Sequence, residues 1–252
     1  MNMILIIAIR EFKSLFLSPL AWSFLAIIQL ILAYLFLTQV ETFMQLQPQL
    51  AALDNGPGLT DIVVTRSFGN AGIILLLVTP LLTMRLICEE RRNKTLALLL
   101  SAPVGNIDII LGKYLGCLGL VLLIVALATL MPLSLLSGGT LDFGKLFANG
   151  LALTLLVAAF TATGLFMSCV AGHPTIAAMA TFGVLLLLWI LDWSAGMEDR
   201  RGNLFEYLSI LRHFQNIQSG LISSVDIVYF LLFTTTFIVL SIRRLDNDRL
   251  QK

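Results

Sequence analysis

Five long runs without a charged side chain divide this 252-residue sequence, and they restrict the fold to one class. The runs cover residues 19–40, 67–84, 114–141, 146–191 and 227–242, with only a His in the fourth. A helix needs about 20 mostly apolar residues to cross the hydrocarbon core of a bilayer. The apolar residues are consecutive rather than alternating, which favours helices over a membrane barrel. Because 58% of the residues are hydrophobic and 12% are charged, the composition also predicts an integral membrane protein.

The run from 146 to 191 is too long for a single crossing, so we expect it to fold back on itself. The expected break is Ala171-Gly172-His173-Pro174-Thr175, because Gly and Pro disfavour the interior of a helix. The sequence therefore predicts one all-α membrane domain over residues 1–252 with six transmembrane helices. Their expected bounds are about 19–40, 67–87, 114–137, 146–171, 175–193 and 226–242. The connections would be 41–66 and 194–225 on one side and 88–113 on the other.

Lys and Arg are distributed unequally between the two sides of this topology. Basic residues near the ends of spans stay on the cytoplasmic side of a membrane. With a cytoplasmic N-terminus, that side holds eleven of the sixteen basic residues. The eleven are Arg10, Lys13, Arg85, Arg91, Arg92, Lys94, Lys113, Arg243, Arg244, Arg249 and Lys252. We therefore expect both termini in the cytoplasm and the loops 41–66 and 194–225 outside. The net charge of +1 gives no reason to expect nucleic-acid binding.

Residues 1–18 precede the first span and have an amphipathic pattern. One helical face carries mostly apolar residues, and Arg10, Glu11 and Ser14 lie largely on another. The apolar face is formed by Ile6, Ile9, Lys13 and Phe16, with Phe12 and Leu15 between them. Such a helix can lie along the cytoplasmic membrane surface until Ser18-Pro19 turns the chain into the first span. The alternative is a frayed extension of that span.

Residues that could carry catalysis or hold a metal are sparse. Cys88, Cys117 and Cys169 form no CxxC pair, and His173 falls in a turn, where we expect a structural role. Gly105 and Gly112-Lys113 look like a phosphate loop, but six residues rather than four separate the glycines and a tyrosine follows the lysine. We therefore expect no catalytic residue and no directly bound cofactor or metal. Any nucleotide energy would come from an ATPase in another chain.

The segment 88–113 is the longest predicted cytoplasmic connection, and it has helical features. Residues 89–100 contain no Gly or Pro, and the acidic residues Glu89 and Glu90 come first. Acidic residues at the start of a helix suit its dipole, and Glu90 and Lys94 would form an i, i+4 pair. We expect this helix to end near Ser101-Ala102-Pro103. Leu96, Leu99 and Leu100 give it an apolar stripe that a solvated tether, the alternative, does not need.

Residues 89–104 and 112–114 resemble a motif of the ABC-2 type transporter permeases. The family pattern is E-x-R-x-x-G/K-T-L-x-x-L-L-x-x-P followed by a G-K segment. The matching residues here include Glu89, Arg91, Lys94, Thr95, Leu96, Leu99, Leu100, Pro103, Gly112 and Lys113. Residues 10–21 resemble the amphipathic segment of the family. The C-terminal part is similar to the gliding-motility-type branch at Tyr207-Leu208-Ser209, His213-Phe214, Gly220, Asp226, Tyr229-Phe230 and Arg243-Arg244.

The resemblance implies an ABC-2, type V exporter-like transmembrane domain in a bacterial inner membrane. It implies two permease chains, identical or paralogous, that are driven by two ATPase chains which bind ATP and Mg²⁺. In this family the connection between spans two and three carries the coupling helix that docks on the ATPase. Carried over, this gives Glu89, Glu90, Arg91, Arg92, Lys94, Thr95, Leu96, Leu99, Leu100, Ser101 and Pro103 as coupling residues. An auxiliary membrane or periplasmic subunit is a further implied partner, beside membrane lipid.

Small residues at four-residue spacing let membrane helices approach closely. Gly112 and Gly116 form one such pair, and Gly164, Ser168 and Gly172 form a longer row. We expect both sets to pack helices within the chain. No ionisable residue is expected squarely inside a span, which disfavours an ion-coupled transporter. A mostly apolar pathway suits an amphipathic or lipid-linked cargo, or a complex that does mechanical work.

Two other functions stay open on the sequence. A membrane-embedded enzyme would need a polar constellation within the spans, and we find no paired carboxylate motif, no serine elbow and no HExxH helix. A scaffold or assembly factor without transport activity is compatible with every pattern described above. Co-purification of an ATPase chain would favour the permease over both alternatives.

Overall fold

The computed structural model describes residues 3–17, 19–50, 58–95, 104–137, 141–195 and 208–250. Within these ranges, six helices are long and apolar enough to cross a membrane. The spans are based on α2 (Pro19–Leu50), α3 (Thr65–Thr83), α6 (Asn106–Leu133), α7 (Phe143–Val170), α8 (Pro174–Ala195) and α11 (Ser224–Leu250). The shorter elements are α1 (Met3–Leu17), the π-helical turn η1 (Thr60–Val64), α4 (Cys88–Arg92), the 3₁₀ turn η2 (Ser134–Ser137) and α10 (Ile210–Gln218). The predicted all-α class with six long apolar helices is confirmed.

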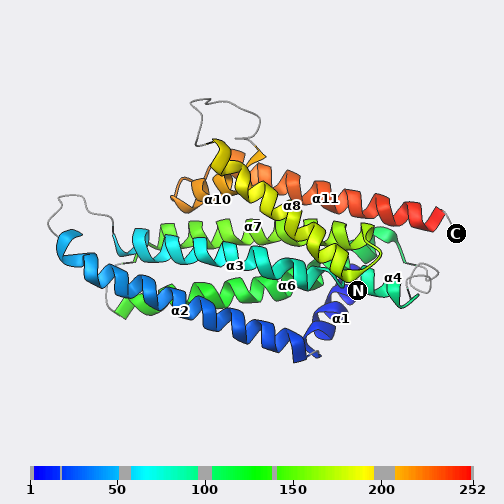
Figure 1. The fold of residues 1–252 in the computed structure, drawn as a ribbon, viewed down its shortest axis with the longest axis horizontal. Coiled ribbons are helices and arrows are strands. Elements are labelled where there is room, and N and C mark those ends of the chain that lie inside the picture. The colour runs from blue at the N-terminus through cyan, green and yellow to red at the C-terminus, as the bar shows by residue number, and fades with distance from the viewer. Residues whose placement is uncertain are drawn as a thin grey trace.

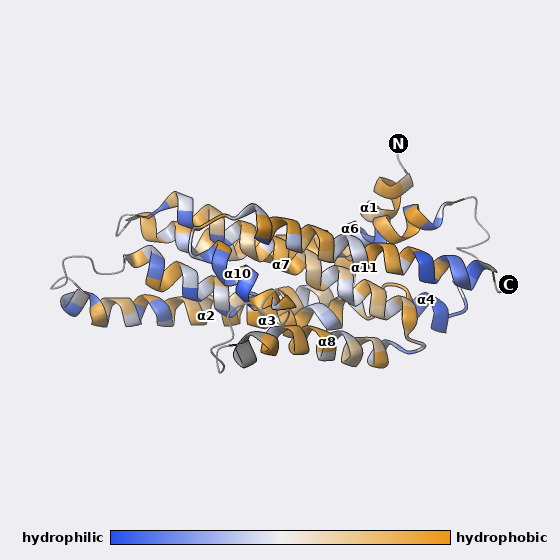
Figure 2. Cartoon of the chain, turned by 90° about the horizontal axis from the view of Figure 1, so that it is seen from above, coloured by the Kyte–Doolittle hydropathy of each residue, from blue (hydrophilic) through white to orange (hydrophobic). Residues whose placement is uncertain are grey.

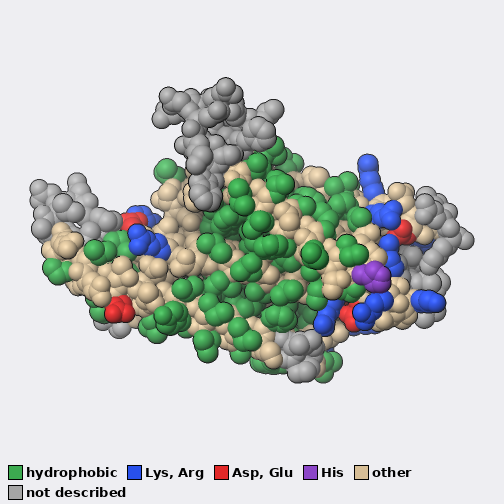
Figure 3. Space-filling model, viewed as in Figure 1, with side chains coloured by type: hydrophobic (Ala, Val, Ile, Leu, Met, Phe, Trp, Pro, Cys, Tyr) green, Lys and Arg blue, Asp and Glu red, His purple; other side chains and the backbone are tan. Residues whose placement is uncertain are grey.

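The six long helices run in alternating directions along one bundle, so both ends of the described chain lie at the same end of the molecule (Figure 1). We call this end, which carries α1, α4 and the last turns of α11, the basic end. The opposite end carries η1, the start of α7 and α10, and we call it the far end. Lys and Arg gather mainly at the basic end in the face shown by Figure 3.

Helix α7 lies at the centre of the bundle and packs against α3, α6, α8, α10 and α11. In its apolar membrane-spanning segment, 67% of the residues are buried inside the molecule, compared with 17% in the corresponding segments of α8 and α11. Small residues explain how so many neighbours fit, because Ala152, Ala159, Ala162 and Gly164 all face other helices at close range. The core is therefore organised around one helix that is rich in small residues.

The outer helices present apolar side chains to their surroundings. Hydrophobic colouring continues along the bundle, and polar residues collect towards its ends (Figure 2). Leu30 on α2, Met179 on α8 and Leu187 on α8 are 71%, 76% and 60% exposed. Large exposed apolar side chains over the middle of a bundle fit contact with lipid chains. The chain is a multi-pass membrane protein.

Several predicted boundaries differ from those of the structure, and three helices extend well beyond their predicted spans. Helix α2 continues to Leu50, and helical structure resumes by Thr60, so most of the predicted loop 41–66 is helical. Helix α6 begins at Asn106 rather than 114, and α11 continues to Leu250. The cause is that a helix satisfies its backbone hydrogen bonds internally, so it can extend beyond the apolar run. Glu, Gln, Met and Leu, which dominate residues 41–50, are good helix formers.

Candidate functional site at the basic end

Ser168 of α7 holds the junction between α3 and α4. The backbone amides of Ile87 and Cys88 donate to its Oγ at 3.0 and 3.1 Å. The hydroxyl in turn donates to the carbonyl of Met84 at 3.2 Å. A serine hydroxyl can accept two hydrogen bonds and donate one, so all of its capacity is used here. Because free amides at a helix start need acceptors, the central helix fixes where α4 begins.

Helix α4 is shorter than expected, since it ends at Arg92 and not near residue 101. Lys94 has a φ of 58°, in the left-handed region. The amide of Thr95 donates to the carbonyl of Glu90, and the amide of Lys94 donates to that of Arg91, as in a Schellman stop. Glycine is favoured at this left-handed position, which gives a physical reason for Gly as an alternative to Lys in the family pattern.

The stop at Lys94 also removes the expected helical pair between Glu90 and Lys94. Five of the predicted coupling residues, Leu96, Leu99, Leu100, Ser101 and Pro103, lie outside the described residues. The segment 88–113 therefore contributes α4, one helical stop and the first turns of α6 to the site that the structure describes.

Lys113 connects three helices at the basic end. Its ammonium contacts Glu11 Oε1 of α1 at 3.1 Å and Glu90 Oε1 of α4 at 2.8 Å. The lysine is 3% exposed and lies two turns inside α6. Lys113 precedes the apolar run that begins at 114, and it lies within a helix because α6 begins before that run. A buried ammonium requires charge partners, and the two carboxylates supply them. We call Lys113, Glu11 and Glu90 the Lys113 cluster.

The last turns of α11 hold α4 from another side. Arg91 pairs with Asp248 of α11 and also donates to the carbonyl of Cys169 on α7 at 3.0 Å. Asp246 accepts a hydrogen bond from Asn106, at the start of α6, at 2.5 Å. The side chains of Glu90 and Arg91 thus form ion pairs within the chain. Of the predicted coupling residues that are described, Arg92, Lys94 and Thr95 are exposed and Glu89 is half-buried.

Helix α1 packs lengthwise against the start of α6. An added Cβ on Gly112 would lie 2.6 Å from Ile7 Cβ, and one on Gly116 would lie 2.7 Å from Glu11 Cβ. Only glycine permits this approach, which brings Glu11 within reach of Lys113. Glu11 therefore lies on the face that packs against α6, and its assignment to the polar outer face was wrong.

The other residues of α1 differ in exposure. The side chains of Arg10, Lys13, Ile6 and Ile9 are exposed, whereas those of Phe12 and Phe16 are half-buried.

The second row of small residues divides into three environments. An added Cβ on Gly164 would lie 2.6 Å from Thr83 Cβ of α3, so this position is a close helix contact. Ser168 makes the hydrogen bonds at the α3–α4 junction. An added Cβ on Gly172 would meet nothing within 4 Å, and Gly172 lies in the turn between α7 and α8 with His173. Its expected role in helix packing is not supported by the described neighbours.

A buried pair closes the far end of the bundle. His213 Nδ1 of α10 lies 2.5 Å from Asp226 Oδ1 at the start of α11, and the histidine ring stacks on Tyr229 at 4.0 Å. Ser209 caps α10 by accepting from the amide of Arg212 at 3.3 Å. On the same end, Lys145 Nζ lies 2.5 Å from Asp61 Oδ1 and joins α7 to η1. Sequence reasoning treated His213 and Asp226 only as points of resemblance and missed their contact.

The geometry at the basic end can be compared with known proteins. A family model described as ABC-2 family transporter protein matches residues 5–250. The chain belongs to this family. ABC-2 family proteins are membrane components of transporters that carry no catalytic site for ATP hydrolysis, and family membership implies an ABC ATPase partner in general. No curated protein matches the chain.

At the basic end, α4 is connected to helices from distant parts of the sequence. Helix α4 is short, and ion pairs join it directly to α6 and α11, while Lys113 of α6 also pairs with Glu11 of α1. These partners are separated from it by up to 157 residues of sequence, so no local pattern could reveal them. One indication of these contacts was present in the sequence, the acidic and basic residues at the end of α11, which lie beyond its apolar run.

Proposed function

We propose that the chain is the permease subunit of an ABC-2 export complex, driven by a separate ATPase that binds α4. One observation carries this proposal: Arg92 of α4 and the following Lys94 and Thr95 are exposed, while ion pairs of Glu90 and Arg91 connect α4 to α6 and α11. A push on the exposed side of such a helix is transferred directly to α6 and α11, and through Lys113 to α1, because charge pairs in a poorly solvated site resist separation.

The rest of the assembly follows from the family resemblance. Two permease chains, identical or paralogous, act with two ATPase chains that bind ATP and Mg²⁺. The basic end faces the cytoplasm of a bacterial inner membrane, since basic residues concentrate there. We place the chain in the gliding-motility-type branch on the resemblance at His213, Asp226 and Tyr229. An auxiliary subunit would bind at the far end.

The test is co-purification of the chain with an ABC ATPase of the same organism, followed by reversal of the exposed charges. In vesicles, Arg92→Glu with Lys94→Glu should lower permease-stimulated ATP hydrolysis at least tenfold while the chain still inserts. The matched control is Arg66→Glu, an exposed arginine at the far end, which should leave stimulation unchanged. Normal stimulation by the double variant would refute α4 as the docking site. A permease that copurifies with no ATPase would favour a scaffold.

A further inference from the structure

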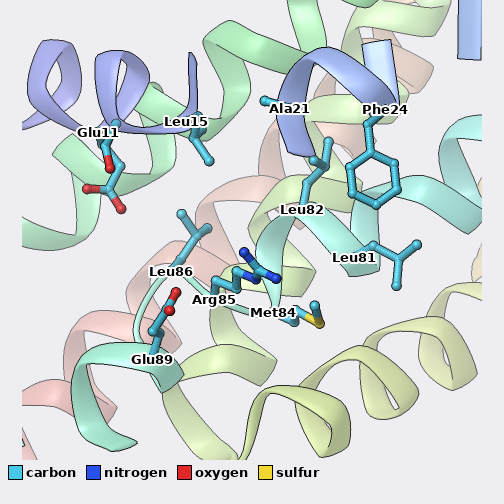
Figure 4. A pocket seen from close by; sticks show the side chains of 11 residues that line it. Glu11, Leu15, Ala21, Phe24, Leu81, Leu82, Met84, Arg85, Leu86 and Glu89 are labelled. Carbon is cyan, nitrogen blue, oxygen red and sulfur yellow. The ribbon is translucent and has the colours of Figure 1, made fainter. Parts of the chain in front are cut away.

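A cavity of about 270 Å³ opens between α1, α2, the end of α3 and α4, next to the Lys113 cluster. Glu11, Arg85 and Glu89 line one side, and Phe24, Leu81 and Leu82 are among the apolar side chains on the other. Figure 4 shows Glu11 and Glu89 on one side of the cavity, Phe24 and Leu81 on the other, and Arg85 between them. Charged and apolar groups are thus partly separated: the side with Glu11 and Glu89 also holds Leu15 and Leu86, whereas the opposite side is apolar (Figure 4).

The separation follows the direction in which the helices cross the membrane. Along the chain, the lining changes from Leu81 and Leu82 in the last turn of α3, through Arg85, to Glu89 in α4. Phe24 lies in the first turns of α2, on the apolar side. The apolar part of the cavity therefore points towards the hydrocarbon core, and the charged part points towards the interface at the basic end. A lipid of that leaflet has the same order of chain and headgroup.

The charges specify the headgroup. Glu11 is already paired with Lys113, at 3.1 Å. Arg85 and Glu89 form no ion pair with each other or with any other side chain in the described ranges, so one cation and one anion are available. A headgroup with a phosphate and a primary ammonium complements both, since guanidinium binds phosphate and carboxylate binds ammonium. An anionic headgroup without an ammonium would satisfy Arg85 but leave Glu89 facing a negative charge.

We propose that this cavity binds a zwitterionic membrane phospholipid, phosphatidylethanolamine, with its phosphate on Arg85, its ammonium on Glu89 and an acyl chain beside Phe24 and Leu81. All residues that line the cavity belong to this chain, so the permease alone should bind the lipid. The inference does not depend on ATPase coupling, and its test contains no ATPase.

The experiment is native mass spectrometry of the full-length chain in detergent, titrated with equal amounts of phosphatidylethanolamine and phosphatidylglycerol. The wild type should retain phosphatidylethanolamine in preference. Glu89→Gln should reduce that preference about fivefold, the effect of losing one partly exposed charge contact, and Arg85→Gln should weaken the binding of both lipids. Ser14→Phe, which places a ring at the cavity rim, should lower the lipid bound per chain.

Glu41→Gln is the matched control, because Glu41 is an exposed carboxylate on α2 far from the cavity. It should bind both lipids as the wild type does. Size-exclusion profiles of all variants exclude misfolding as the cause of a loss. Equal retention of the two lipids by the wild type, or a preference that survives Glu89→Gln, would overturn the proposal. Occupancy by detergent alone, with no retained phospholipid, would also overturn it.

Discussion

Lys113 shows how one side chain can position three helices. Its ammonium is almost fully buried and has two carboxylate partners, from α1 and α4. Neither carboxylate is buried as deeply, since the side chains of Glu11 and Glu90 are 23% and 27% exposed. Removing one member of such a cluster leaves the others with uncompensated charge, which costs more than the cluster gained when it formed.

We expect Lys113→Met to lower the free energy of unfolding by about 2 to 3 kcal/mol, somewhat less than for a fully buried pair because the carboxylates keep some water. The loss arises from Glu11 and Glu90 facing each other without a cation. Combining Lys113→Met with Glu11→Gln and Glu90→Gln should restore most of the stability. Denaturant unfolding in detergent micelles measures both variants. If the triple variant is no more stable than the single one, charge repulsion is not the cause.

At the scale of elements, the sequence predicted the parts of the helices that lipid determines and missed the parts that other helices determine. Six spans follow from the apolar runs, because the bilayer sets the length of each run. The start of α6 at Asn106 and the stop of α4 at Arg92 do not follow from them. The start of α6 is accompanied by a contact across the fold, Asn106 with Asp246, and α4 is held by that of Arg91 with Asp248, whereas its stop is the local turn at Lys94. A single sequence holds no record of pairs that far apart.

The contact between α4 and α11 gives a prediction about coupling. Asp248→Asn should lower permease-stimulated ATP hydrolysis about fivefold, since loss of roughly 1 kcal/mol of coupling lets α4 move without α11. The exchanged pair Arg91→Asp with Asp248→Arg should recover part of the stimulation. Recovery will be incomplete because Arg91 also donates to the carbonyl of Cys169 at 3.0 Å. Full activity of Asp248→Asn would show that α11 takes no part.

At the scale of the whole molecule, the two ends differ in chemistry as well as in charge. The basic end joins α1, α4, α6 and α11 by ion pairs, and it carries the proposed lipid cavity. The far end has the buried pair of His213 with Asp226 and the contact of Lys145 with Asp61. Helix α7 runs between the two ends and packs against α10 and α11 as well as α3.

The orientation of the chain in the membrane can be tested by labelling introduced cysteines, because the native cysteines should react little. Cys88, Cys117 and Cys169 are all buried, so a membrane-impermeant maleimide should react poorly with the wild type in intact bacterial cells. Arg66→Cys at the far end should be labelled in intact cells, whereas Lys94→Cys should be labelled only after the membrane is permeabilised. The reason is the proposed topology, in which the basic end and eleven of the sixteen basic residues stay in the cytoplasm. The reverse labelling pattern would place α4 outside the cell, beyond the reach of any cytoplasmic ATPase, and would contradict the proposed function together with the topology.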